Sequence, residues 1–131
     1  LNRLDQTGIQ RLRFTTSHPK DLSDELILAY ASLKSLAPHL HLPIQSGSDR
    51  MLKAMNRGYT VESYLAKAAK LRRALPAIGL TTDLIVAFPG ETEEDFSDTL
   101  ELARLMRYDS AFTFIYSKRA GTRAAELAGE V

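Results

Sequence analysis

The stretch Leu80–Phe88 reads Leu-Thr-Thr-Asp-Leu-Ile-Val-Ala-Phe and is followed at once by Pro89-Gly90-Glu91-Thr92. Its nearly continuous apolar second half is typical of a strand that is covered on both faces, as in a parallel sheet. Pro89 and Gly90 then break the strand, and Thr92 with Asp95 three residues later predicts a capped helix. We therefore interpret this stretch as one strand–loop–helix unit of an α/β fold.

The same succession of strand, polar cluster and helix recurs along the chain. Apolar or alternating runs predict strands over Ile9–Thr15, His39–Ile44, Leu80–Phe88 and Ser110–Tyr116. The polar clusters that follow them occupy residues 16–19, 45–49, 89–92 and 117–122. Strands that alternate with helices indicate a parallel sheet with right-handed crossovers. Because loops at the carboxyl ends of parallel strands lie on one rim, we expect these clusters to converge in space.

Capping residues and apolar spacing predict the helices. Asp21 or Ser23 begins one that Pro38 ends, a short helix covers Arg50–Asn56, and Thr60 begins a longer one. The residues expected on the inner face of the helix after Thr92 are Phe96, Leu100, Ala103 and Leu105 or Met106.

The two ends of the chain resemble interrupted helices. Leu1–Leu4 reads as a last helical turn with Gly8 as its stop, and a helical run starts at Ala124 and continues to Ala128. We therefore expect the chain to be an excised piece of a larger protein.

Composition restricts the kind of protein. With 131 residues, 44% hydrophobic and 25% charged, the chain is about the size of one globular domain. No apolar run is long enough to span a bilayer, and a net charge of +1 gives no nucleic-acid signature. The absence of Cys excludes disulfides and thiolate-held metals within the chain. The P-loop, GxGxxG, GxSxG and HExxH motifs are absent as well.

Two polar clusters suit the binding of a polar ligand, although each also fits an ordinary turn. In Gln45-Ser46-Gly47-Ser48, backbone N–H groups at a helix start would hold an anion or carboxylate. Alternatively, Gly47 simply supplies a positive φ and Ser48 the helix cap. In Phe88-Pro89-Gly90-Glu91, an aromatic ring and an acid suit a nucleoside, or else Phe88 belongs to the core and Glu91 to the helix dipole.

Other polar residues have two interpretations each. His39 and His41 share a strand face, where hydrogen-bonded histidines are favoured over a metal pair because no third ligand is suitably spaced. Asp83 lies within an apolar strand and needs a partner, so it is either a structural anchor or a site residue. The cations that would contact phosphates are Arg57, Lys118, Arg119 and Arg123, whereas Arg72 and Arg73 are expected on a solvated helix face.

Taken together, the stretches His39–Arg50, Met55–Thr60, Thr82–Thr92 and Phe112–Ser117 resemble the radical SAM methylthiotransferases in both order and spacing. The sequence of these stretches is most similar to the tRNA branch of the family, which adds a methylthio group to C2 of N6-isopentenyladenosine. The resemblance implies that residues 1–131 are later β/α units of a partial, open TIM-like barrel with parallel strands. An N-terminal cluster domain and the CxxxCxxC loop would lie upstream, and an RNA-binding domain downstream.

The resemblance also implies roles for individual residues. Gln45, Ser46, Gly47 and Ser48 would lie near the methionyl and ribose parts of S-adenosylmethionine (SAM). The cofactor set would further include Asp83, with Phe88, Pro89, Gly90 and Glu91 along the adenine, and Tyr116 and Ser117 closing its pocket. Arg57, Lys118 and Arg119 would face the cofactor mouth or the substrate RNA. Ala87 stands where family members usually have Gly, and Lys118-Arg119-Ala120 where they often have Pro-Arg-Pro.

The implied whole enzyme uses SAM and 4Fe–4S clusters whose ligands lie outside this chain, and its substrate is tRNA. This piece alone would be inactive and would hold no metal. We expect a cytoplasmic monomer without membrane contact. Two alternatives stay open: an acid–base α/β-barrel metabolic enzyme that uses Asp83, Glu91 and a His, and a non-catalytic RNA-binding module, which the weak net charge disfavours.

Overall fold

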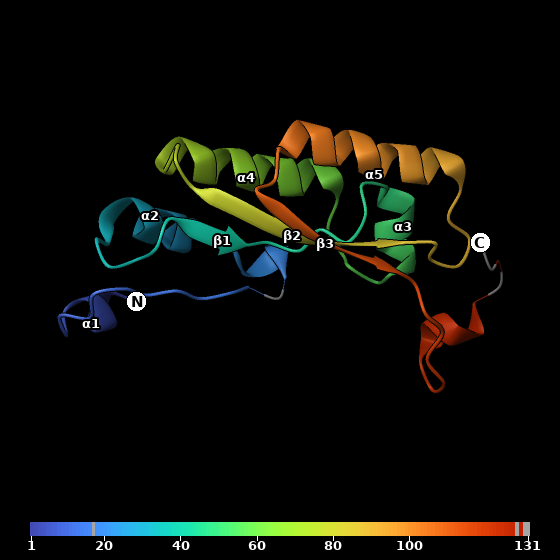
Figure 1. The fold of residues 1–131 in the computed structure, drawn as a ribbon, viewed down its shortest axis with the longest axis horizontal. Helices are drawn as coiled ribbons and strands as arrows, with labels where there is room; N and C mark the ends of the chain where they lie inside the picture. Colours follow the sequence, from blue (N-terminus) through green and yellow to red (C-terminus); the bar gives the residue numbers. More distant parts are fainter. Residues whose placement is uncertain (17, 128, 130–131) are drawn as a thin grey trace.

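Three parallel strands form one open sheet in the order β1–β2–β3, as the alternating pattern predicts (Figure 1). The computed structural model describes residues 1–16, 18–127 and 129. The elements are α1 (Asn2–Asp5), the 3₁₀ helix η1 (Pro19–Asp21), α2 (Asp24–Ser32), β1 (His39–His41), α3 (Asp49–Ala54), α4 (Val61–Ala74), β2 (Gly79–Val86), α5 (Glu93–Met106), β3 (Ser110–Ile115) and the 3₁₀ helix η2 (Arg123–Glu126). Ser17 in the first polar cluster and Ala128 in the predicted C-terminal helical run lie outside the described residues.

The register of the sheet places the strand ends together. His41 of β1 lies opposite Thr81, and Thr81 lies opposite Ser110 at the start of β3. Backbone pairing continues beyond β1, because Leu42 N–H donates to the Thr81 carbonyl and Gln45 forms a bridge with Leu84. The loops after β1, β2 and β3 therefore leave from the same end of the sheet.

The prediction of a strand over Ile9–Thr15 is wrong in extent. In this segment only Leu12 forms a bridge, with Leu36, although the chain stays beside β1. Two side chains make contacts there instead: the Thr16 hydroxyl donates to the His41 carbonyl at 3.1 Å, and Arg13 meets His39 at 3.3 Å. Side-chain hydrogen bonds thus replace a regular backbone ladder.

The apolar core lies between the sheet and the helices on one face (Figure 1). In β1 and β2 the even-numbered residues point into it, and Leu40, Leu80 and Thr82 are fully buried. Helix α4 begins at the predicted cap Thr60 and buries Tyr64, Ala68 and Leu71 on one face. Odd-numbered residues of β1 and β2 lie on the other face. Phe112 and Phe114 of β3 pair with Asp83 and Ile85 on this face, and they are more than half exposed at 58% and 53%.

The predicted inner face of α5 is wrong by one residue at Phe96, Leu100 and Ala103, whereas Met106, the cap Thr92 and its capping box with Asp95 are confirmed. The buried residues of this helix are Asp95, Thr99, Leu102 and Met106. Phe96, Leu100 and Leu105 are exposed instead. The reason is that the first half of α5 packs against the polar loop after β1, which needs hydrogen-bonding side chains rather than apolar ones.

Smaller differences concern the other helix ends. Ser23, one of the two predicted caps, begins α2, which ends at Ser32 well before Pro38. Ser48 caps α3. The run after Ala124 forms the short η2 rather than a longer helix within the described part of the chain. No helix among the described residues is both long and apolar enough to cross a bilayer.

Candidate functional site

Two residues with left-handed backbone follow the first two strands, beyond their carboxyl ends. Gln45 has φ 77° and Ala87 has φ 56°, and neither is glycine. The Gln45 N–H donates to the Asp83 carbonyl, and the Ile85 N–H donates back to the Gln45 carbonyl, each at 2.9 Å. Left-handed backbone costs a residue with a Cβ roughly 1–2 kcal/mol. Such outliers persist where the surroundings hold them, and they gather at functional sites.

Gly47 is required by packing and not by a positive φ, which corrects that part of the turn interpretation, whereas the predicted Ser48 cap is confirmed. A Cβ at this position would lie 2.5 Å from the Asp98 carbonyl oxygen and 2.6 Å from the Thr99 Cα. The loop after β1 therefore lies directly against the backbone of α5. The Thr99 hydroxyl accepts the Gly47 N–H at 2.9 Å and lies 3.3 Å from the hydroxyl of the fully buried Ser46.

Asp95 joins the loop after β1 to the loop after β2. Its carboxylate accepts the Ser48 hydroxyl at 2.5 Å, and it accepts both the N–H and the hydroxyl of Thr92. It also forms an ion pair with Arg50, whose Nε lies 3.2 Å from Oδ1. Asp95 is only 5% exposed, and the hydrogen bonds from Arg50 above all hold its pKa well below the usual range.

Arg50 extends the same connection to the Pro89-Gly90 turn. Its Nη2 donates to the Gly90 carbonyl at 2.7 Å while it contacts the Asp95 carboxylate. Gly90 has φ 81°, a conformation that favours glycine. One guanidinium therefore holds a carbonyl of one loop and the carboxylate that anchors the other.

Glu91 and Tyr116 present unsatisfied polar atoms at this rim. Within the described ranges, the buried side-chain polar atoms without a hydrogen-bond partner are Glu91 Oε1 and the Tyr116 hydroxyl. The other carboxylate oxygen of Glu91 accepts the Ala87 N–H. Burial raises the pKa of Glu91. The rings of Phe88 and Tyr116 meet edge to face, with centroids 5.1 Å apart. Buried orphan groups of this kind are rare and point to an additional partner.

Asp83 has a partner, but Asp83 lies within β2 and not in the loop that follows this strand. Its carboxylate is 3.4 Å from Nε2 of His41, and Nδ1 of His41 lies 3.0 Å from the Thr81 hydroxyl. His39 also contacts Thr81, at 3.3 Å, and burial lowers its pKa. The preference for hydrogen-bonded histidines is confirmed. No group of three or more His, Cys, Asp or Glu that could hold a metal occurs in the part of the chain that the structure describes.

The predicted cations occupy different surroundings. Lys118 and Arg119 are exposed in the loop after β3, next to the exposed Ser117. Arg57 is half-buried near Tyr59. It lies in the loop between α3 and α4, which follows a helix and not a strand. Arg72 differs from its prediction, because it donates to the carbonyls of Met106 and Arg107 at the end of α5 rather than lying on a solvated face.

Sequence reasoning missed Arg50 and Thr99 as members of this region. Asp95 was identified only as part of the capping box, which accounts for its bonds to Thr92. Its contacts with Ser48 and Arg50 join residues 47 and 45 positions apart, a separation that leaves no local pattern.

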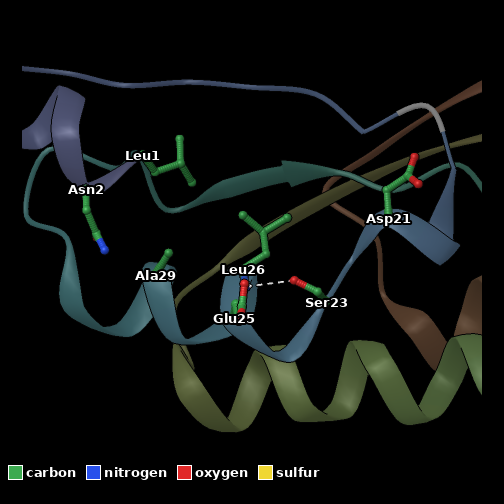
Figure 2. Close-up of a pocket in the computed structure, with 7 residues that line it drawn as sticks. All are labelled: Leu1, Asn2, Asp21, Ser23, Glu25, Leu26 and Ala29. Atoms are coloured by element: carbon green, nitrogen blue, oxygen red, sulfur yellow. Dashed lines mark hydrogen bonds between the residues drawn. The ribbon is translucent and has the colours of Figure 1, made fainter.

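A separate hollow lies between α1 and α2, away from the rim. Figure 2 shows its lining residues: Leu1, Asn2, Asp21, Ser23, Glu25, Leu26 and Ala29. In Figure 1, α1 and the loops after β2 and β3 are drawn at opposite ends of the molecule. The Ser23 hydroxyl is engaged in capping α2. This hollow contains none of the residues that the sequence predicts for a site.

Comparison with known proteins assigns the family. The profile of the family described as "Radical SAM superfamily" matches residues 1–103. The chain belongs to the radical SAM superfamily. This membership fits an open parallel sheet with its candidate site at the carboxyl ends of the strands.

Curated relatives indicate which enzymes of the superfamily the chain resembles. The chain is 60% identical over 124 residues to a tRNA-2-methylthio-N(6)-dimethylallyladenosine synthase of Caldicellulosiruptor saccharolyticus, which covers 95% of the chain and 26% of that protein. It is 58% identical to proteins with the same name in Carboxydothermus hydrogenoformans and Alkaliphilus oremlandii, covering 95% and 100% of the chain. The chain spans 28% and 27% of the length of these two relatives.

Proposed function

We propose that this chain is part of a radical SAM tRNA methylthiotransferase and that its rim holds SAM. The identity to named synthases supports the reaction class. The structural observation that carries the proposal is the pair of buried, unpartnered polar atoms, Glu91 Oε1 and the Tyr116 hydroxyl, beside the ring of Phe88. Radical SAM membership favours this function over an acid–base barrel enzyme or a non-catalytic RNA-binding module.

The adenosine end of SAM fits the segment Phe88–Glu91 together with Tyr116. An adenine has an exocyclic N–H donor for Glu91 Oε1 and ring nitrogens that accept from the Tyr116 hydroxyl. Phe88 supplies an aromatic wall whose placement is fixed by the contact with Tyr116. We assign Pro89 and Gly90 to the turn that shapes this wall, and Ser117 to its outer edge.

The methionyl and ribose end would lie along Gln45–Ser48. The hydroxyls of Ser46 and Ser48 already have partners in Thr99 and Asp95, so these two residues would act by shaping the loop. Gln45 is the member we assign to direct contact. Gly47 allows the loop to approach α5, and Asp83 supports Gln45 through its carbonyl.

The 4Fe–4S clusters would be held by cysteines outside this chain, which itself has none. SAM bound at a reduced cluster would supply the radical chemistry of the reaction. The residues of this chain would bind and orient the cofactor and exclude water from its adenosine end.

The substrate we propose is tRNA that carries N6-isopentenyladenosine, modified at C2 of the base. Lys118 and Arg119 would contact RNA phosphates from the exposed loop after β3. Arg57 would contribute from the loop before α4, at the edge of the site. We place the enzyme in the cytoplasm, where tRNA is modified, as a monomer.

Measuring SAM binding tests this site. In the longer enzyme that we propose contains this chain, Glu91→Gln and Tyr116→Phe should each weaken SAM binding by about 5–100-fold, because one buried polar contact is lost. Gln45→Ala should have a comparable effect. Cluster content should stay unchanged. Unaltered SAM affinity in all three variants would contradict the assignment.

A further inference from the structure

The ion pair of Arg50 with Asp95 connects the loops after β1 and β2, and neither residue is among those that we assign to contact with SAM. Asp95 is buried, with its side chain 7% exposed, whereas the side chain of Arg50 is 55% exposed. Between them they contact Ser48 of one loop and Gly90 of the other.

Both carboxylate oxygens of Asp95, and Nε and Nη2 of Arg50, have defined partners. Oδ1 of Asp95 accepts from the Ser48 hydroxyl and from Arg50 Nε, and Oδ2 accepts from Thr92 and from Arg50 Nη2. The same Nη2 reaches the Gly90 carbonyl. A planar guanidinium with several fixed N–H donors can hold a carboxylate and a carbonyl at once, which a lysine ammonium cannot reproduce in this geometry.

The connection acts on the site through Gly90. The Gly90 carbonyl belongs to the peptide that enters Glu91, whose Oε1 is one of the two orphan atoms. On the other side, Ser48 lies three residues from Gln45 and caps α3 by accepting the Met51 N–H. A shift of either loop relative to the other would separate groups that both need to reach the same ligand.

We propose that Arg50 and Asp95 are positioning residues that set the relative placement of the two rim loops and thereby the affinity for SAM. The proposal rests on the proposed function of the rim, because it concerns the same ligand. Neither side chain needs to touch the cofactor. If Arg50 has this positioning role, the affinity for SAM depends on the shape of its guanidinium and not only on its charge.

Arg72 offers a matched control. Its side chain also donates to backbone carbonyls of another part of the chain, those of Met106 and Arg107. These lie at the other end of α5 from Thr92 and Asp95. Loss of this arginine removes a comparable connection without altering the rim.

The test compares Arg50→Lys, Arg50→Gln and Arg72→Gln in the longer enzyme with clusters reconstituted anaerobically. SAM affinity is measured by calorimetry, and thermal stability is measured in parallel. We expect both Arg50 variants to bind SAM about tenfold more weakly. Arg50→Lys should retain much of the stability through its charge, so that affinity and stability separate. Arg72→Gln should lower the melting temperature but change SAM affinity less than twofold.

Equal loss of SAM affinity in Arg72→Gln, or unchanged affinity in both Arg50 variants, would overturn the positioning role. Normal SAM affinity in Arg50→Lys, together with weakened binding in Arg50→Gln, would contradict the requirement for a guanidinium. If the unsubstituted enzyme does not bind SAM, the proposed function fails and this inference fails with it. If Glu91→Gln weakens binding but the Arg50 variants do not, only this inference fails.

Discussion

Glu91 accepts a hydrogen bond from the backbone N–H of Ala87, a residue with a left-handed φ of 56°. The acid that we assign to the adenine site is therefore held by a strained turn immediately after β2. The orientation of the Glu91 carboxylate depends on that backbone conformation, and the strain is compensated by the hydrogen bonds around it.

Replacing Ala87 should reveal this strain. Ala87→Gly is expected to stabilise the protein by up to about 1 kcal/mol, because glycine adopts a positive φ without the Cβ clash, although the more flexible unfolded chain offsets part of the gain. Thermal unfolding followed by circular dichroism measures the change. Ala66→Gly in the exposed middle of α4 is the control, and there we expect a loss of about 0.5–1 kcal/mol. A destabilised Ala87→Gly variant would show that the turn is not strained.

Glu91→Gln should change how stability depends on pH. Burial raises the pKa of Glu91 above its ordinary value of 4.5, so its charged form is disfavoured in the folded state. The unsubstituted protein should therefore lose stability as the pH rises through the raised pKa, and the glutamine variant should not. The difference in unfolding free energy between the two proteins is measured from about pH 4 to about pH 7. A difference that stays constant over this interval would argue against a buried carboxylate at this position.

Asp95→Asn should destabilise the fold by about 1–3 kcal/mol, less than for a fully buried pair because Arg50 is more than half exposed to solvent. The folded pKa of Asp95 is depressed. Its contribution is therefore present above the ordinary pKa of 3.8 and is lost as the pH falls below that value. Urea unfolding at neutral and acidic pH measures both effects. Asp24→Asn, which removes only the exposed pair with Lys70, should cost less than about 1 kcal/mol. Equal effects of the two variants would contradict a structural role for Asp95.

Parts of this arrangement were predictable because their causes are local. The caps Thr60 and Thr92 follow from residue type and spacing, and the apolar run of β2 and the parallel order follow from the alternating pattern. The inner face of the first half of α5 was not predictable from its apolar residues, because its partner is a polar loop. The ion pair of Arg50 with Asp95 depends on tertiary approach across 45 residues, which leaves no periodic signal.

The absence of cysteine predicts that the chain by itself assembles no iron–sulfur cluster. Anaerobic reconstitution of the purified chain with iron and sulfide should leave no broad cluster absorption in the visible range. The same preparation should form no 5′-deoxyadenosine from SAM. A stable cluster spectrum after removal of excess iron would show that other ligands suffice.

The exposed cations Lys118 and Arg119 should affect RNA more than the cofactor. In the longer enzyme, the double variant Lys118→Gln, Arg119→Gln is expected to raise the apparent KM for tRNA and to flatten its dependence on salt, because fewer counterions are released. SAM binding should stay close to that of the unsubstituted enzyme. The pair Lys53→Gln, Arg73→Gln, two exposed cations on α3 and α4, serves as the control. Normal tRNA kinetics at every salt concentration, together with weakened SAM binding, would reverse this assignment.

The central claim is that this chain belongs to an enzyme that adds a methylthio group to tRNA. The most direct measurement is mass spectrometry of nucleosides from tRNA carrying N6-isopentenyladenosine, after incubation with the reconstituted longer enzyme, SAM and a reductant. The account predicts formation of 2-methylthio-N6-isopentenyladenosine that depends on SAM and is reduced in Glu91→Gln. An enzyme with intact clusters that cleaves SAM but leaves this tRNA unmodified would contradict the claim.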